Sequence, residues 1–191
     1  MSRENILKAI QQNQPKVSRL PEVNINSIRY DNPKEKFAST LQGIGGVVIE
    51  VRSWDEIASS IKGTFSSGKR IVCNIPEIAI NQSALGNDPH QLENVELAVI
   101  KGEFGVAENG AIWVNDQAMG DRALPFISQH LAIVINKSDI LHTLHDAYSR
   151  IGQANYNLGI FIAGPSKTAD IEQSLVLGAH GARSLTAFLI G

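Results

Sequence analysis

The sequence predicts an α/β protein with a mostly parallel sheet flanked by helices. Between residues 33 and 75, segments with helical periodicity alternate with short apolar runs that are typical of buried strands. Glycine, proline or a helix-capping residue separates each segment from the next. Helices and strands that alternate at this spacing are typical of a parallel sheet whose faces are covered.

Composition narrows the class further. The 191 residues, 43% of them hydrophobic and 19% charged, suit one folded domain. Seventeen basic and nineteen acidic residues form no basic stripe, so we expect no nucleic-acid partner. No apolar run approaches the roughly 20 residues of a membrane span. The polar start Met1-Ser2-Arg3-Glu4-Asn5 is unlike a signal peptide, which favours the cytoplasm.

The chain has a single cysteine, Cys73, within the strand-like run Ile71–Ile75. One cysteine excludes an internal disulfide and a self-contained iron–sulfur cluster, because such clusters need several thiolates. We interpret Cys73 as a small, buried apolar residue rather than a nucleophile. The sequence therefore predicts no cofactor bound by this chain alone, and no metal.

The amino-terminal part, residues 1–31, is predicted to be a helix and an arm, and residues 32–191 one domain. Ile6, Leu7 and Ile10 share one face of a helix over residues 3–13. Residues 14–31 show little periodicity, and the sequence does not decide whether this arm packs on its own domain or on another subunit.

The domain is predicted to begin with a helix over residues 33–43, capped by Asn32 and ended by glycine. A helix capped by Ser53, with Glu56 as capping-box partner, should run to Gly68. Asn109-Gly110 predicts a tight turn, and Asp116 to Leu124 a loop or short helix. The other predicted helices cover about 78–85, 138–151 and 169–177, and the predicted strands 47–51, 69–75, 97–100, 111–114, 131–135, 158–163 and 184–190.

The segment after residue 163 has the densest set of functional residue types. Gly164-Pro165 ends the preceding strand, and Ser166, Thr168 and Asp170 stand where the predicted helix would begin. Free amides at a helix start bind anions, and Lys167 adds positive charge. His180, between Gly178 and Gly181, can donate a hydrogen bond or move a proton.

Other polar residues have alternative interpretations. Glu108, beside Asn109-Gly110, is either a solvated carboxylate or a nucleophile or base presented on a turn. His130 precedes a strand and is either structural or close to a site. The spacing of His142, His145 and Asp146 resembles a metal site, but their helix face reads as solvated, so we predict no metal there.

The run from Gly164 to Glu172, together with Gly178-Ala179-His180-Gly181, closely resembles the carboxy-terminal signature of the LUD domain, the lactate-utilisation protein C family. Ala107-Glu108-Asn109-Gly110-Ala111 corresponds to that family's Ala-Glu-Thr-Gly-Thr stretch. The resemblance covers nearly the whole chain. Asn109 and Ala111 replace threonines, and Ala182 replaces the proline that usually follows His-Gly.

The resemblance implies a fold like that of the group of ribose-phosphate isomerase (RpiA), glucosamine-phosphate deaminase (NagB) and CoA transferase. It also implies a role in oxidising L-lactate to pyruvate with an iron–sulfur partner and a second subunit, where only the partner proteins hold the clusters. Residues 107–110 also resemble the Ser-Glu-Asn-Gly motif of class I CoA transferases, whose glutamate forms a thioester.

We therefore expect the turns after residues 101, 135 and 163 to meet at one end of the sheet and to bind a small anion, namely a carboxylate, a phosphate or a CoA ester. The alternatives to a lactate-utilisation component are a CoA-transferase-like or sugar-phosphate-type enzyme using Glu108, and a non-catalytic ligand-binding module. Predicted catalytic residues are Glu108, Asp170 and His180. Predicted ligand-binding residues are Asn109, Gly110, His130, Gly164, Ser166, Lys167, Thr168, Glu172, Gly178 and Gly181.

Overall fold

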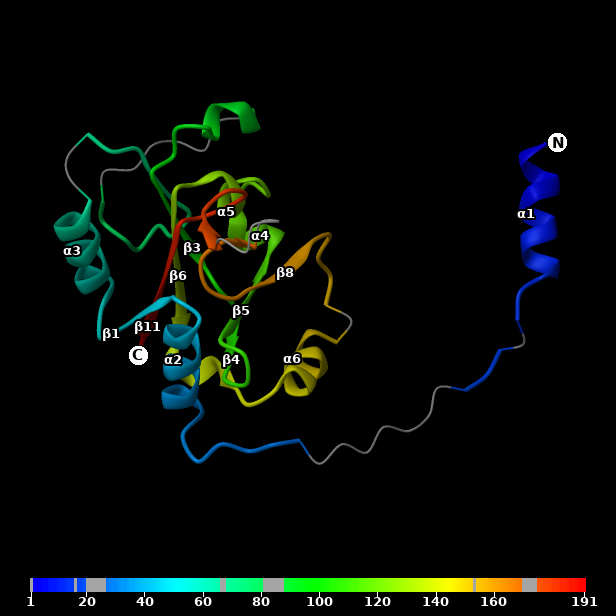
Figure 1. The fold of residues 1–191 in the computed structure, drawn as a ribbon, viewed down its shortest axis with the longest axis horizontal. Helices are drawn as coiled ribbons and strands as arrows, with labels where there is room; N and C mark the ends of the chain where they lie inside the picture. The colour runs from blue at the N-terminus through cyan, green and yellow to red at the C-terminus, as the bar shows by residue number, and fades with distance from the viewer. Residues whose placement is uncertain are drawn as a thin grey trace.

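A computed structural model of the chain shows two sheets with helices packed around them (Figure 1). The structure describes residues 2–15, 17–19, 27–65, 68–80, 88–152, 154–169 and 175–191.

The larger sheet has five strands, all parallel, in the order β1-β11-β6-β3-β2. It therefore confirms the predicted α/β class with a mostly parallel sheet. Its strands are β1 (Val47–Val51), β2 (Ile71–Cys73), β3 (Leu97–Lys101), β6 (His130–Asn136) and β11 (Ser184–Ile190). The strand at Ile71 is shorter than the predicted 69–75.

The second sheet has four strands in the order β7-β4-β5-β8. β5 runs antiparallel to both β4 and β8, and β4 is parallel to β7. The predicted turn at Asn109-Gly110 joins β4 to β5. These strands are β4 (Phe104–Val106), β5 (Ala111–Asn115), β7 (Ile140–Leu141) and β8 (Gly159–Ile162).

Alternating side chains of the large sheet form two cores on its opposite faces. Leu97, Val99, Ala132 and Val134 pack with Ile57 and Ile61 of α3 (Trp54–Thr64). The intervening residues, such as Ala98 and Leu131, face the other way. They pack with Phe37 and Leu41 of α2 (Pro33–Gly43) and with Ile112 and Val114 of the second sheet. On its outer face that sheet carries Phe104 and Trp113, which pack with Ala147 and Ile151 of α6 (Leu144–Ile151).

The amino-terminal helix α1 (Arg3–Gln12) agrees with the prediction and buries none of its residues. In Figure 1 it lies apart from the sheets. The remaining short helices are α4 (Asp116–Met119), α5 (Leu124–Ile127), η1 (Pro89–Leu92) and η2 (Lys137–Asp139). Within the described ranges, no helix is long and apolar enough to cross a membrane.

Local capping chemistry explains where the predicted helices begin. The side chain of Asn32 accepts a hydrogen bond from the Glu35 amide at 3.2 Å, and Ser53 accepts one from the Glu56 amide at 3.3 Å. Glycines close α2 as predicted, since Gly46 N–H donates to the Leu41 carbonyl at 2.9 Å. The helix that follows Ser53 ends earlier than predicted, at Thr64 rather than at Gly68.

Three predicted elements differ from the structure. A helix does not begin at Ser138, because Ile140 and Leu141 pair with β4 and Thr143 instead starts α6 through a capping box with Asp146. The strand after residue 158 is half-buried rather than buried. Residues 78–80 are not helical, and the rest of the helix predicted over 78–85 lies outside the described residues.

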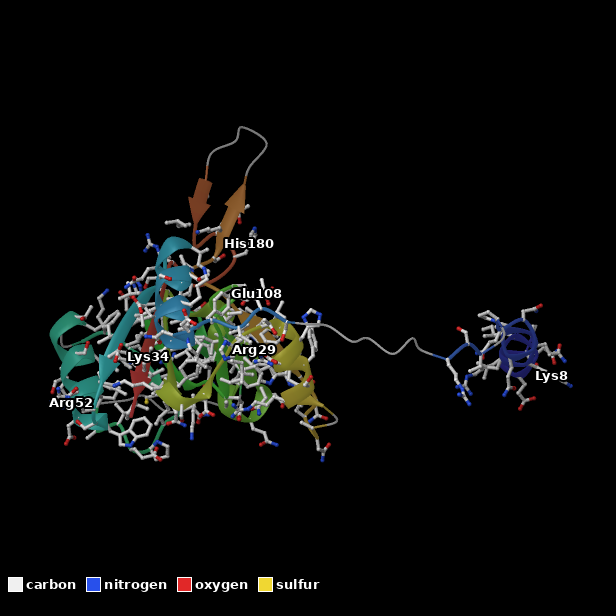
Figure 2. All side chains as sticks on the ribbon, turned by 90° about the horizontal axis from the view of Figure 1, so that it is seen from below. Lys8, Arg29, Lys34, Arg52, Glu108 and His180 are labelled. Atoms are coloured by element: carbon white, nitrogen blue, oxygen red, sulfur yellow. The ribbon has the colours of Figure 1, made fainter. Side chains whose placement is uncertain are left out.

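A fourth predicted element, in the segment after residue 163, differs most. The prediction of a helix over residues 169–177 is wrong for the described residues of that range, 169 and 175–177, which lie in strands. β9 (Lys167–Ala169) and β10 (Leu175–Leu177) form an antiparallel pair, which projects from the body of the protein in Figure 2. Thr168 and the run Leu175-Val176-Leu177 are strand-forming residues, and their preference prevails over the capping pattern that precedes them.

Candidate functional site

The carboxy-terminal segment begins where β8 ends. Gly164 has a φ of +74°, and a Cβ added there would lie 3.1 Å from the Ile44 carbonyl oxygen at the end of α2. Only glycine combines this backbone conformation with so close an approach. The turn at Gly164 is therefore held against the α2–β1 connection.

No helix begins among the described residues 164–169, so the predicted helix-start anion site is not formed there, and two amides of the segment donate to backbone carbonyls. The Ser166 amide donates to the Ala182 carbonyl at 2.8 Å, and the Gly178 amide donates to the Ser166 carbonyl at 3.0 Å. In place of a helix start with several free N–H groups, the described residues of this segment form β9. Asp170 and Glu172 lie outside the described residues.

These backbone bonds nevertheless form the wall of a cavity of about 340 Å³. Gly164, Ser166, His180 and Gly181, all predicted ligand-binding or catalytic residues, lie along it. The rest of the lining is mostly apolar and comes from Pro125, Phe126, Leu131, Ile160, Phe161, Ile162, Ala163, Pro165, Ala182 and Leu185. We call this space the motif cavity. A wider hollow beside it shares Phe126, His180 and Gly181 and reaches Gly178.

Polar groups of the motif cavity come from few side chains. His180 is exposed and lies at the base of the β9–β10 hairpin (Figure 2). Ser166 is half-buried, and its Oγ lies 3.3 Å from a Cβ built on Gly181. One imidazole and one hydroxyl among apolar walls suit a small organic molecule with a single polar end.

Lys167 and Thr168 lie in β9. The ammonium group of Lys167 donates to the Ile44 carbonyl, at the carboxy-terminal end of α2. A cation there stabilises the partial negative charge of the helix end. Thr168 is paired with Val176 of β10. Neither residue lines the motif cavity.

Glu108, Asn109 and Gly110 lie on a neighbouring turn. The pairing of Ile112 with Ile162 brings the turn before β5 and the turn after β8 to the same end of the small sheet. Gly110 has a φ of +70°, and a Cβ there would lie 2.9 Å from the Leu41 amide nitrogen. The two turns therefore lie along the last turn of α2, one at Leu41 and the other at Ile44.

The Glu108 side chain is exposed, and its carboxylate accepts a hydrogen bond of 2.9 Å from the Leu144 amide (labelled in Figure 2). Leu144 is the first residue of α6, so Glu108 satisfies one of the free amides at that helix start. Asn109 is bound locally, since its side-chain oxygen accepts from the Ala111 amide at 3.0 Å.

His130 does not join the other predicted residues. Its Nδ1 lies 2.7 Å from Ser184 Oγ, and its ring packs edge-on against Phe65 on the α3 side of the large sheet. Its neighbour Leu131 lies in the core of the opposite face. The large sheet therefore separates His130 from His180.

The predicted meeting of the turns after 101, 135 and 163 is wrong. Gly164 and Ser166 contact Ile44 and Ala182, which precede β1 and β11, so they lie at the amino ends of the parallel strands. Lys101 and Asn136 end β3 and β6 at the opposite edge. β8 belongs to the second sheet and not to the parallel one. The turn that follows it therefore lies at the amino ends of the parallel strands, although it follows the carboxyl end of its own strand.

Ion pairs occupy the carboxyl-end edge instead. Glu50 lies 3.4 Å from Lys34 and 3.5 Å from Lys137, and Asp139 lies 2.8 Å from Arg150. Burial raises the pKa of Asp139, but hydrogen bonds from Asn136 and Arg150 outweigh burial and hold that pKa below its ordinary value. The charged side chains at this edge are thus paired with one another.

The His142, His145 and Asp146 spacing serves structure. His142 Nδ1 accepts a hydrogen bond of 3.0 Å from the Tyr30 amide, and Asp146 pairs with Arg29 at 3.0 Å. No metal-binding group of three or more acidic, histidine or cysteine side chains occurs among the residues that the structure describes. These contacts attach residues 29 and 30 to α6, which the sequence pattern did not predict.

Sequence reasoning also missed the apolar lining of the motif cavity. Phe126 is 48% exposed, and Ile160 and Ile162 are half-buried in β8. The signal in the sequence is a run of three large apolar residues, Ile160 to Ile162, shortly before a polar glycine-rich segment. On its own this run predicts only a buried strand.

Fold and site together define an α/β protein with a small, mostly apolar cavity built by a glycine-rich carboxy-terminal segment. The model of the LUD domain matches residues 4–190, and the chain belongs to that family.

Named relatives agree. The chain is 33% identical over 101 residues to lactate utilization protein C of Bacillus pumilus, and 31% identical over 98 residues to the uncharacterized protein YkgG of Escherichia coli. These matches cover 47% and 48% of this chain but only 42% of each relative. Lactate utilization protein C of Deinococcus radiodurans is 26% identical over 149 residues, which are 71% of this chain and 69% of the relative.

A solved structure shows the same fold. The crystal structure of a DUF162 family protein from Deinococcus radiodurans superimposes with a TM-score of 0.64 at 16% identity, covering 83% of this chain and 96% of that one. The likeness supports the described arrangement of sheets and helices.

Proposed function

We propose that this LUD-domain protein is a component of a lactate-utilisation system and binds a small organic acid in the motif cavity. The observation that carries the proposal is the family match over residues 4–190, together with relatives named lactate utilization protein C. In such a system L-lactate loses two electrons and two protons to become pyruvate. We place this component in the cytoplasm.

The cavity chemistry supports a small carboxylic acid. Ser166 and His180 can hydrogen-bond a carboxylate, while Phe126, Ile160 and Ile162 offer surface for an apolar group. The Ser166 amide donates to the Ala182 carbonyl, so we assign recognition to the side chains of Ser166 and His180. Lys167 lies just outside the lining and adds positive charge near the segment.

Electron transfer needs a partner. Iron–sulfur clusters are held by several cysteine thiolates, and this chain has one cysteine whose thiol pKa is raised by burial. The residues therefore do not fit a cluster, and we propose that partner proteins hold the clusters and take the electrons.

Growth and binding together test the proposal. Deleting the coding sequence from its organism should abolish growth on L-lactate but not on glucose, and the wild-type sequence should restore it. His180→Ala should fail to restore growth, whereas His145→Ala, an exposed histidine on α6, should restore it. Unimpaired growth of the deletion strain on L-lactate contradicts the proposed system.

A second candidate is an enzyme that uses Glu108 as nucleophile, either a CoA transferase or a sugar-phosphate-type enzyme. It is favoured by the exposure of the Glu108 carboxylate on a tight turn. In a CoA transferase the Glu108 carboxylate would attack an acyl-CoA, forming a mixed anhydride and releasing CoA thiolate. The thiolate would then attack the glutamyl carbonyl, giving the glutamyl thioester and a free carboxylate. Incubation with acetyl-CoA followed by hydroxylamine should then give a hydroxamate at Glu108, detectable by peptide mass, and an unmodified peptide rules this out.

A third possibility is a module that binds an organic acid without turning it over. It predicts binding of L-lactate or pyruvate in calorimetry together with normal growth of the His180→Ala strain. Calorimetry thus tests whether the chain binds the acid, and growth tests whether lactate utilisation needs the chain.

A further inference from the structure

A second cavity lies on the other face of the large sheet. It has a volume of about 390 Å³ and opens between the carboxy-terminal half of α3 and the amino ends of the parallel strands. Ile61 and Phe65 form its roof, and Ile49, Ala132 and Phe188 belong to the sheet beneath. We call it the α3 cavity.

The α3 cavity exists because α3 ends before the sheet does. Ile57 and Ile61 cover the middle of the sheet, and the helix stops at Thr64. The small side chain of Ala132 leaves space between its larger neighbours. A volume of this size is within the range of small-molecule sites.

Polar groups converge at one end of the α3 cavity. His130 and Ser184 start two adjacent strands, where they pair in register, and their side chains form a hydrogen bond of 2.7 Å. Within the described residues, Nε2 of His130 makes no hydrogen bond, so it is available to a ligand. Thr186 adds a hydroxyl next to this pair.

Charge at the rim is balanced. Lys69 and Glu96 lie 3.2 Å apart, with Glu96 only 26% exposed. Because Lys69 and Glu96 neutralise each other, the polar groups left to recognise a ligand are the imidazole of His130 and the hydroxyls of Ser184 and Thr186. The lining therefore combines an aromatic and aliphatic body with donors at one end.

The two cavities are separate sites. His130 and Ser184 belong to the α3 cavity, whereas Leu185, the residue after Ser184, belongs to the motif cavity. Consecutive residues of a strand point to opposite faces of a sheet. Leu131 lines both cavities, but the polar recognition groups differ. Of the two cavities, His130 and Ser184 line only the α3 cavity, and Ser166 and His180 line only the motif cavity.

We propose that the α3 cavity binds a carboxylic acid with an aromatic or branched apolar body. The body packs against Ile61, Phe65 and Phe188. The carboxylate accepts a hydrogen bond from Nε2–H of His130, while the Ser184 hydroxyl donates to Nδ1 and fixes that tautomer. The apolar part of the α3 cavity offers more contact surface than the single methyl group of L-lactate can fill. Its ligand therefore differs from the acid proposed for the motif cavity.

Calorimetry with a matched pair of probes tests this. L-3-phenyllactate and L-lactate share one head group and differ by a phenyl ring. In the full-length Ser166→Ala chain, which lacks a recognition group for L-lactate in the motif cavity, phenyllactate should bind at least about 10-fold more tightly than L-lactate, because the ring buries apolar surface. His130→Ala should weaken phenyllactate binding about 10-fold through loss of a charge-assisted hydrogen bond. Ser166→Ala, in the motif cavity, should leave it unchanged.

Amide chemical shifts of the wild-type chain decide the location without any variant. Phenyllactate should shift residues 60–65, 130–132 and 184–188. Shifts confined to residues 160–166 and 180–182, loss of affinity in Ser166→Ala, or no binding at millimolar phenyllactate would overturn the proposal. Since growth on L-lactate depends on the motif cavity, failure of this site leaves the proposed function standing.

Discussion

The carboxylate of Glu108 accepts a hydrogen bond of 2.9 Å from the backbone amide of Leu144, the first residue of α6. The bond joins the turn between β4 and β5 to the helix on the outer face of the small sheet. A residue that the sequence offered as a nucleophile thus also has a structural role.

Replacing Glu108 by Ala should therefore lower the free energy of unfolding by about 1 kcal/mol, the usual effect of losing a helix cap. Urea denaturation would measure it. Glu77→Ala serves as the control, since Glu77 is exposed on a loop and should change stability by much less. Equal stability of Glu108→Ala and wild type would mean that the bond contributes nothing.

The turn at Gly110 should be intolerant of a side chain. Gly110→Ala places a methyl group 2.9 Å from the Leu41 nitrogen at a φ of +70°, so we expect a loss of more than about 1 kcal/mol. Gly63→Ala is the matched control. Gly63 lies in α3 with nothing within 4 Å of an added Cβ, and alanine should stabilise that helix by up to about 1 kcal/mol. A tolerated Gly110→Ala would contradict the close contact with α2.

Acid should destabilise the protein through Asp139. The folded-state pKa of this group lies below its unfolded value, so its contribution to stability is complete above the ordinary carboxyl pKa and is lost as pH falls through the folded value. Between about pH 4 and pH 2, wild type should lose more stability than Asp139→Asn. Unfolding curves over that range would show it, with the exposed Asp31→Asn expected to follow wild type.

Cys73 should react slowly with alkylating reagents. Burial, assisted by the charge of Glu77, raises the pKa of its thiol, and only the thiolate is nucleophilic. The rate of reaction with iodoacetamide should reach its midpoint at a higher pH in the folded chain than in the urea-unfolded chain. A midpoint at or below that of the unfolded chain would mean that the thiol is activated.

The strands of the large sheet were the most predictable part of the fold. Apolar runs such as Leu131 to Ile135 are typical of buried strands. Asn32, Ser53 and Gly45-Gly46 mark helix ends through short-range bonds. These elements depend on residues that are close together in the sequence, so the sequence alone predicts them. The likeness to the ribose-phosphate isomerase group stays a prediction.

What could not be predicted depends on pairing between distant residues. From the sequence alone, Thr143 lies inside the predicted helix over residues 138–151. It becomes the start of α6 only because Ile140 and Leu141 pair with β4. Lys167 to Leu177 carries capping residues that suit a helix, but Ser166 and Gly178 bond to each other and favour a hairpin. The same limit applied to the site, where His130 and Leu131 are neighbours in sequence yet pack on opposite faces of the large sheet.

The position of β11 has a consequence for biosynthesis. This strand, made of residues 184–190, lies between β1 and β6, so it joins the earliest strand of the sheet to the middle of the chain. While the protein is being translated, β1 has no neighbour in the sheet until those residues leave the ribosome. Nascent chains should therefore wait, incompletely folded and exposed to chaperones, until the last strand inserts between the two.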